Sequence, residues 1–323
     1  MKINAAQALP TTDGATPHAI EHEVGLANGS GLILRGTLVV PAGPGPWAAV
    51  LIIPGSGPLD RDSNIGSLRM NIGTMAAALA QRGIASLRYD RRGIAASDGN
   101  WLATGFFDNR DDALAALHYL RLRPEVHGDA LGVVGHSEGG LHALWLAGHA
   151  NINAAVLLAT PARSGRDALH WQETRIRSTL PTIARPVSAL MRAIASRTLA
   201  RVEASTGDTA RIYGRRMNVR WYRELLNYDP LEDLAMISAP VLAITGDKDL
   251  QVSPDDLEIF TRLIPTHAET DTVTDLTHLL RRDTQRPRLR SYRRLLKQPM
   301  DHDLVENVAI WLRSQLVDIP HSD

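Results

Sequence analysis

The chain contains no cysteine and very little lysine. Of its 323 residues, 35 are lysine or arginine, and the lysines are Lys2, Lys248 and Lys297. Without cysteine the chain cannot form disulfides, thiolate nucleophiles or cysteine-ligated zinc sites. The preference for arginine runs along the whole chain, so we interpret it as codon bias rather than as a phosphate-binding surface.

The chain also lacks long apolar runs and an excess of charge of either sign. The 35 basic and 35 acidic residues cancel, so no global field favours nucleic acid or an anionic membrane. No apolar run approaches the length that spans a bilayer, and residues 1–18 form a polar lead-in without the apolar region of a signal peptide. We therefore expect a cytoplasmic protein without membrane insertion or a nucleic-acid partner, and we leave a homodimer open.

Apolar segments of strand length are abundant, and they alternate with helical segments. The expected strands are residues 48–53, 84–89, 130–135, 154–159, 240–245 and 269–273. The expected helices between and after them are residues 71–81, 108–122, 139–149, 255–263 and 304–316. Continuous apolar runs of this length are typical of strands that are buried on both faces of a parallel sheet. The alternation predicts a doubly wound α/β sheet flanked by helices.

Two segments depart from this alternation. Residues 19–40 alternate in polarity around the turn sequence at 28–31, which predicts an antiparallel hairpin. The segment 161–235 looks helical, contains no convincing strand and is rich in arginine. We interpret it as a helical cap subdomain (a lid) that is inserted into a core formed by residues 19–160 and 236–318.

Residues 135–139 read Gly-His-Ser-Glu-Gly and match the pattern G-x-S-x-G. The motif follows an apolar strand and precedes a helix-forming run, as in the turn that exposes a nucleophilic serine at the carboxyl edge of a sheet. The glycines suit a turn that brings backbone segments close together. We predict that Ser137 is the nucleophile and that the neighbouring His136 points away from the pocket. The other interpretation is a glycine-rich turn with an incidental serine.

A serine nucleophile needs a histidine base and a carboxylate that orients this base. In this arrangement the chain order is serine, then the acid, then histidine. Asp247 and Asp249 both lie in the loop after the expected strand 240–245. We prefer Asp249, because three residues past Gly246 the loop can turn back toward the serine, and Asp247 stays open as the other choice.

Three histidines in the last quarter of the chain are candidates for the base. His278 comes just after the last expected strand, which places it at the carboxyl edge of the sheet. His267 precedes that strand, and His302 begins the terminal helix. Topology therefore favours His278.

Acyl transfer also needs backbone N–H donors for the oxyanion that develops on the substrate. One expected donor is the N–H of Glu138, the residue after the nucleophile, and the second comes from the loop after an early strand. Residues 54–58 read Pro-Gly-Ser-Gly-Pro and follow such a strand. We predict Ser56 as the second donor, with Gly57 as the alternative.

The motifs PGSGPLDRD, RYDRRGIAASDG, GHSEGG, GDKD and LTHLL occur in this order along the chain. Together they resemble bacterial α/β-hydrolases of the serine esterase and serine-aminopeptidase-like branch, which are often described as lysophospholipase-like. The resemblance covers about residues 23–316. It implies the α/β-hydrolase fold, with Ser137, Asp249 and His278 as the catalytic triad. It also implies Ser56 and Glu138 as the oxyanion donors.

The chain departs from the pattern of these relatives in two loops. Many relatives have histidine where this chain has Pro54, which we expect to alter hydrogen bonding around the oxyanion loop without removing the donor. Alanines stand at positions 95–96, where relatives carry a further glycine before the serine of this loop, here Ser97, and we expect a stiffer loop. Residues 60–62 (Asp-Arg-Asp) match the family pattern, and we interpret them as an ion-pair cluster rather than as metal ligands.

The sequence therefore predicts a serine hydrolase that cleaves carboxylic esters of small to medium acyl substrates through an acyl-enzyme. Neither a metal nor an organic cofactor is expected. The alternative is a serine aminopeptidase or amidase with the same triad. An aminopeptidase would need an acidic group for the substrate amine, whereas the expected cap is basic. A third hypothesis is a catalytically inactive homologue that binds a ligand.

Overall fold

The computed structural model describes residues 7–8, 19–181 and 185–318. The predicted polar lead-in therefore lies outside the described residues, apart from a two-residue strand. Within the described part of the chain, a 9-stranded sheet has the order β1-β2-β3-β5-β4-β6-β7-β10-β11. Its strands are β1 (Gln7–Ala8), β2 (Ala19–Ala27), β3 (Ile33–Pro41), β4 (Trp47–Ile53), β5 (Ile84–Tyr89), β6 (Val126–His136), β7 (Ala154–Leu158), β10 (Val241–Gly246) and β11 (Ala268–Val273).

The first strands form the predicted antiparallel hairpin. β2 and β3 pair antiparallel over their whole length, with Ala27 opposite Ile33. In the turn between them, the side chain of Asn28 accepts hydrogen bonds from the N–H groups of Ser30 and Leu32, each at 3.0 Å. β3 then pairs antiparallel with β5, and from β5 to β11 the neighbouring strands are parallel. The predicted mostly parallel sheet is confirmed.

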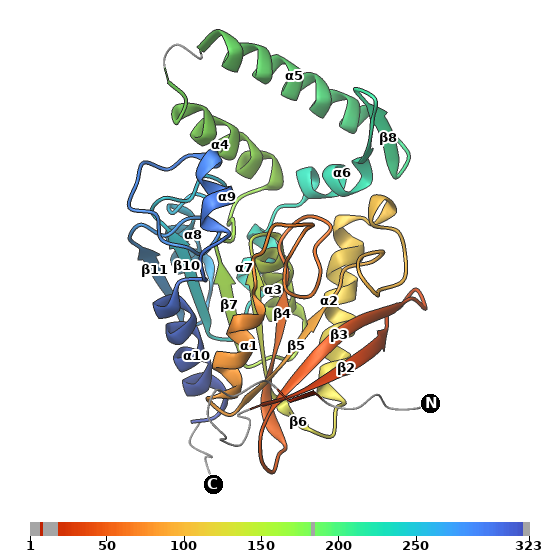
Figure 1. The fold of residues 1–323 in the computed structure, drawn as a ribbon, viewed down its shortest axis with the longest axis vertical. Coiled ribbons are helices and arrows are strands. Elements are labelled where there is room, and N and C mark those ends of the chain that lie inside the picture. Colours follow the sequence, from red (N-terminus) through yellow and green to blue (C-terminus); the bar gives the residue numbers. More distant parts are fainter. Residues whose placement is uncertain (1–6, 9–18, 182–184, 319–323) are drawn as a thin grey trace.

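Helices cover both faces of the sheet and enclose two apolar cores (Figure 1). One face carries α1 (Gly73–Ala80) and α10 (His302–Leu316), and the other carries α2 (Phe106–Arg121), α3 (Glu138–His149) and α8 (Asp256–Leu263). Because side chains alternate along a strand, β4 serves both cores: Leu51 and Ile53 pack on the side of α2 and α3, and Val50 and Ile52 on the side of α1 and α10. This double burial explains the continuous apolar runs in the sequence.

Residues 161–235, which we call the inserted segment, follow β7 and precede β10. Its elements are α4 (Gly165–Ser178), α5 (Arg185–Ala204), β8 (Thr209–Ile212), β9 (Arg215–Asn218), α6 (Val219–Asn227) and α7 (Leu231–Met236). The expectation that this segment contains no strand was wrong, because β8 and β9 form an antiparallel hairpin. The hairpin turns at Tyr213 and Gly214, which have φ of 48° and 79°. Tyrosine is not a residue that signals such a turn, so the pattern was missed.

The inserted segment lies over the carboxyl edge of the parallel strands (Figure 1). α6 contacts α2 of the core as well as α4 and α5. The short helices η1 (Trp101–Ala103), η3 (Leu289–Ser291) and α9 (Tyr292–Leu295) occur in the loops. None of the helices in the described ranges is long and apolar enough to cross a membrane.

Candidate active site

The predicted site residues follow four strands of the parallel sheet. Ser56 comes after β4, Ser137 after β6, Asp249 after β10 and His278 after β11. The carboxyl ends of parallel strands meet at one edge, where open α/β sheets bind their ligands. The topology therefore brings all four loops to the edge that the inserted segment covers.

Ser137 occupies a strained turn between β6 and α3. Its φ of 55° and ψ of −119° lie in a region of backbone conformation that residues other than glycine rarely adopt. Its N–H donates to the carbonyl of Leu158 at 2.8 Å, which ties the turn to β7. A side chain on Gly135 would overlap the backbone of Gly139, and one on Gly139 would overlap the carbonyl of Ile53. The glycines of the motif are therefore required by close backbone approach, as the sequence indicated.

Asp249 is completely buried and accepts three hydrogen bonds. Its Oδ1 accepts from the N–H groups of Gln251 and Val252 at 2.7 and 2.9 Å, and its Oδ2 accepts from His278 Nδ1 at 2.9 Å. Asp247 is exposed and instead accepts from the N–H of Asp275 at 2.8 Å. Of the two aspartates, the structure therefore places Asp249 against the histidine.

His278 lies beside the residue that precedes the nucleophile. His136 Nε2 donates to the carbonyl of His278 at 2.9 Å, and the two rings are 5.0 Å apart. Burial lowers the pKa of His136 to about 3, so that this ring is neutral at physiological pH. Because His278 donates from Nδ1, its Nε2 is left to accept a proton. Within the described residues no hydrogen bond joins Ser137 Oγ to His278 Nε2, so this link stays a prediction; such bonds often tighten only with substrate.

A cavity of about 90 Å³ lies at the nucleophile, and both predicted oxyanion donors line it. Its wall includes Ser56, Ser137 and Glu138, whereas Gly57 does not contribute. In the described part of the chain, neither the Ser56 N–H nor the Glu138 N–H donates a hydrogen bond. The remaining lining residues come from the loops and from α3, α4 and α6: Leu141, Pro161, Gly165, Ala168, Leu169, Gln172, Trp221, Leu225, Gln251 and Val252.

The side chain of Glu138 is buried beside the nucleophile in a network that the sequence did not reveal. Its Oε1 accepts from Arg91 at 3.0 Å, Asn109 at 3.1 Å and His142 at 3.2 Å. Its Oε2 accepts from the indole of Trp221 in α6 at 3.1 Å. Although burial opposes ionisation, the charge of Arg91 and the hydrogen bond from His142 lower the pKa of Glu138 to about 2. The carboxylate is therefore ionised, and both of its oxygens accept hydrogen bonds.

Arg91 joins the two predicted halves of the oxyanion site. One guanidinium nitrogen donates to Glu138, and the other donates to the carbonyl of Pro54 at 3.0 Å, in the loop that carries Ser56. Arg91 belongs to the motif RYDRRG and follows β5 at the same sheet edge, which was the signal available in the sequence. Through these two contacts Arg91 ties the loop after β4 to the first residue of α3.

Two features of the family motifs can be located in the structure: Ala95, where relatives carry glycine, and the Asp-Arg-Asp stretch at residues 60–62. Ala95 has a φ of 48°, a conformation that favours glycine. The predicted ion-pair cluster at residues 60–62 is present: Arg61 pairs with Asp90 at 2.8 Å, and Asp62 pairs with Arg88 at 3.1 Å. Among the described residues, no group of three or more histidine, aspartate or glutamate side chains could hold a metal ion.

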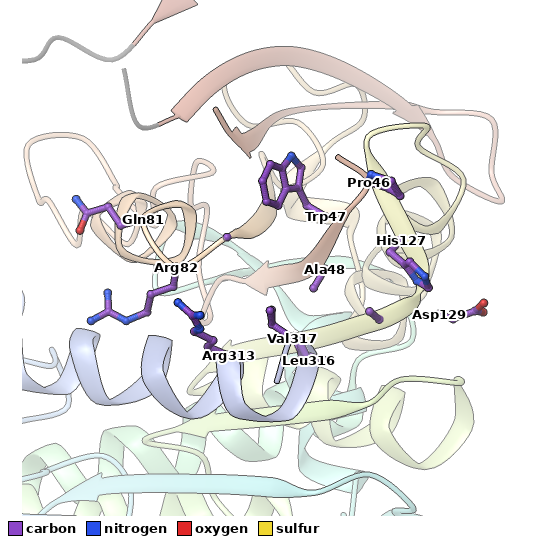
Figure 2. A pocket seen from close by; sticks show the side chains of 12 residues that line it. Pro46, Trp47, Ala48, Gln81, Arg82, His127, Asp129, Arg313, Leu316 and Val317 are labelled. Atoms are coloured by element: carbon purple, nitrogen blue, oxygen red, sulfur yellow. The ribbon is translucent and has the colours of Figure 1, made fainter. Parts of the chain in front are cut away.

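A larger cavity of about 700 Å³ lies at the opposite edge of the sheet. Figure 2 shows Trp47 at the start of β4, together with Arg82 and Arg313, around this cavity. His127 and Asp129, near the start of β6, also line it. None of the predicted catalytic residues belongs to its wall, so it does not compete with the carboxyl edge as a catalytic site.

The comparison with protein families and curated proteins finds relatives among hydrolases. The Hydrolase_4 family model, described as serine aminopeptidase, S33, matches residues 69–285. Esterase EstD of Thermotoga maritima is 25% identical over 303 residues, which are 93% of this chain and 69% of EstD. Dipeptidyl-peptidase 5 of Porphyromonas gingivalis is 32% identical over 117 residues, which cover 35% of this chain and 16% of the relative.

Solved structures share the fold. The structure of Est1E from Butyrivibrio proteoclasticus with bound ferulic acid has a TM-score of 0.60 and 19% sequence identity, and the match covers 90% of this chain and 98% of Est1E. The α/β-hydrolase GrgF from a Penicillium species has a TM-score of 0.61 and 20% identity, with coverage of 92% and 99%. The predicted α/β-hydrolase fold is confirmed.

Proposed function

Because this chain belongs to the Hydrolase_4 family of serine aminopeptidase-like α/β-hydrolases, we propose that it is a serine hydrolase that cleaves carboxylic esters of small to medium acyl substrates. The observation that carries the proposal is the buried hydrogen bond of 2.9 Å between Asp249 and His278, next to a strained serine turn. Ser137 is the nucleophile, His278 the base and Asp249 the residue that orients the base.

The reaction proceeds in two steps. His278 Nε2 takes the hydroxyl proton of Ser137 while Oγ attacks the ester carbonyl, and the N–H groups of Ser56 and Glu138 stabilise the resulting oxyanion. His278 then gives the proton to the leaving alkoxide, the C–O bond breaks, and an acyl-enzyme and an alcohol are formed. Water, deprotonated by His278, then attacks the acyl carbon; the bond to Ser137 Oγ breaks, His278 returns the proton to Oγ, and the acid is released.

The charge of the pocket favours esters over peptides with a free amino terminus. Glu138 is the acidic residue among those that line the cavity at Ser137. Its buried carboxylate already accepts from Arg91, Asn109, His142 and Trp221, so its charge is balanced within the protein rather than held for a substrate ammonium group. The esterases EstD and Est1E among the relatives and structural neighbours agree with this preference.

The inserted segment acts as a cap over this pocket, on a core formed by residues 19–160 and 236–318. α4 and α6 of the segment contribute Ala168, Leu169, Trp221 and Leu225 to the wall around Ser137. The indole of Trp221 also donates to Glu138 at 3.1 Å. These contacts support a cap that shapes the acyl-binding space.

Substitution of the nucleophile tests the proposal. We expect Ser137→Ala to abolish the burst of p-nitrophenol from p-nitrophenyl acetate and to prevent labelling by a fluorophosphonate probe, because no oxygen is left to attack. Ser63→Ala is the matched control: Ser63 is a buried serine in the loop after β4 that does not line the pocket. Retained burst and labelling in Ser137→Ala would overturn the assignment.

The same assays separate the alternatives. Wild-type protein that neither turns over nor becomes labelled would be a ligand-binding homologue. Hydrolysis of aminoacyl p-nitroanilides in preference to p-nitrophenyl esters would make it an aminopeptidase.

A further inference from the structure

The cavity at Ser137 is too small for a whole ester substrate. Its volume is about 90 Å³, whereas pockets for small molecules usually measure ~300–1,000 Å³. It can hold the reacting carbonyl and a few neighbouring atoms. The rest of the substrate needs another space.

A second cavity of about 590 Å³ lies inside the inserted segment, between α4, α5, β9 and α6. Most of its wall is apolar: Leu169, Leu199, Val202, Met217, Tyr222 and Leu226. Val202 and Leu226 are buried, and Leu199 and Tyr222 are half-buried. This cavity is large enough for an alkyl chain or an aromatic ring.

Helix α4 separates the two cavities. Gly165, Ala168 and Gln172 line the cavity at Ser137, and Arg166, His170 and Glu173 line the second cavity. In each set the residues are three or four positions apart, so each set forms one stripe along the helix. The stripes are offset by one or two residues, so the two cavities lie along adjacent faces of α4.

Helix α6 repeats this arrangement. Trp221 and Leu225 line the cavity at Ser137, and the next residues, Tyr222 and Leu226, line the second cavity. α4 and α6 contact each other. Leu169 of α4 belongs to both walls, so the boundary between the cavities is this side chain.

We propose that the longer apolar group of the ester passes Leu169 and occupies the cavity between α4, α5 and α6. The substrates are then esters with an extended alkyl or aromatic group, and the reacting carbonyl alone lies in the small space at Ser137. This inference rests on the proposed function, because the carbonyl must be held at Ser137. The apolar group can belong to the acid or to the alcohol of the ester, because either would make the same apolar contacts with the cavity wall.

Two substitutions obstruct the route at different points. Leu199→Trp fills the second cavity from α5, away from the small cavity, and Leu169→Trp narrows the boundary. If the apolar group belongs to the acid, we expect for each variant that the ratio of kcat/KM for p-nitrophenyl octanoate to that for p-nitrophenyl acetate falls at least about tenfold, since loss of apolar contacts to the alkyl chain is worth this much. Leu190→Trp is the control, because Leu190 lies on α5, is 60% exposed and does not line the cavity.

A second substrate series identifies the source of the apolar group. Octyl acetate and ethyl acetate, followed by titration of the released acid, vary the alcohol instead of the acid. A fall of the octyl-to-ethyl ratio in Leu199→Trp, without a change in the octanoate-to-acetate ratio, assigns the cavity to the alcohol. Thermal unfolding followed by circular dichroism shows that the variants are folded.

The outcomes separate this inference from the proposed function. If wild-type protein hydrolyses p-nitrophenyl acetate and both ratios are unchanged in Leu199→Trp and Leu169→Trp, the cavity does not bind substrate and the inference is wrong. If no ester is hydrolysed and Ser137 is not labelled by a fluorophosphonate, the proposed function itself is wrong.

Discussion

The carboxyl edge of the sheet and the inserted segment above it hold their side chains in different ways. At the edge, Asp249, His278 and Glu138 have exposed fractions of 0%, 4% and 4%, and their side chains take part in buried hydrogen bonds. In the inserted segment, Gly165 is the buried residue that α4 contributes, and Leu190 on α5 is 60% exposed. The edge is packed as a protein interior, whereas the inserted segment combines largely exposed helix faces with a small buried cluster: Val202, Ile212, Val219 and Leu226.

This difference matches two different tasks. A proton transfer requires atoms that are held within a fraction of an ångström, and buried hydrogen bonds provide such precision. Substrate preference requires a space of suitable size and polarity, which a few apolar side chains can supply. We therefore expect substitutions at the edge to reduce kcat or stability, and substitutions in the inserted segment to change the range of substrates.

The largest effect is expected for the two aspartates after β10. Asp249→Asn should lower kcat for p-nitrophenyl acetate by roughly 10⁴-fold, because the amide favours the wrong tautomer of His278. Asp247→Asn should leave kcat close to that of the wild type, since Asp247 is exposed and bonds to the Asp275 N–H. A larger loss in Asp247→Asn than in Asp249→Asn would reverse the assignment.

The next test compares a glycine of the edge with one of the inserted segment. Gly135→Ala should destabilise the protein by on the order of 4 kcal/mol or more, because the new methyl group overlaps the backbone of Gly139. Gly207→Ala should change stability by less than about 0.5 kcal/mol, since the new methyl group would lie 3.7 Å from the carbonyl oxygen of Thr209, an ordinary contact distance. Chemical denaturation measures both. Equal effects would contradict the contrast in packing.

The third test concerns the buried carboxylate of Glu138. Glu138→Gln leaves Arg91 without its buried counter-charge and should destabilise the protein by about 3 kcal/mol. The matched change on the side of the inserted segment, Trp221→Phe, removes one donor to this carboxylate and should cost about 1 kcal/mol. If Trp221→Phe were the more harmful of the two, the network would depend on the inserted segment rather than on the edge.

The pH dependence of stability gives a further readout for Glu138. Its pKa is about 2 in the folded protein, below the ordinary value of 4.5. The carboxylate therefore stabilises the fold fully above about pH 4.5, and this contribution is lost as the pH falls toward about 2. We expect the difference in unfolding free energy between the wild type and Glu138→Gln to shrink across this range, which denaturation at several pH values can measure.

The smallest effect is expected in the loop after β5. Ala95 has a φ of 48°, so Ala95→Gly should relieve backbone strain and stabilise the protein by about 0.5 kcal/mol after the higher entropy of unfolded glycine is counted. Ala96→Gly, at a neighbouring position without positive φ, should destabilise it by a similar amount. A lower melting temperature for Ala95→Gly than for Ala96→Gly would show that the loop stores no strain.

Much of the core was predictable because its physical requirements leave marks in the sequence. Strands that are covered on both faces must be apolar throughout, and the predicted strand 84–89 has the bounds of β5. A turn that brings backbones into contact must carry glycine, as at Gly135 and Gly139. The start of β6 was harder to predict: the strand begins at Val126, before the expected start at residue 130, because residues 127–129 (His-Gly-Asp) interrupt the apolar run.

The inserted segment was harder to predict because few of its residues are constrained by burial. The hairpin β8–β9 has four-residue strands rich in arginine, and its turn uses Tyr213. The second cavity depends on how α4, α5 and α6 are arranged, and no local pattern encodes that arrangement. Leu169 therefore carried no signal in the sequence, although it lines both cavities.

The sequence by itself determined the order of the core strands and helices, the serine turn and the order in which the candidate nucleophile, acid and base follow one another. These features depend on residues that are neighbours in the chain. Only the tertiary structure placed Asp249 rather than Asp247 against His278 and joined Glu138 to Arg91 and Trp221, which are 47 and 83 positions away. Contacts between such distant segments arise from packing of the whole chain, so no local pattern can specify them.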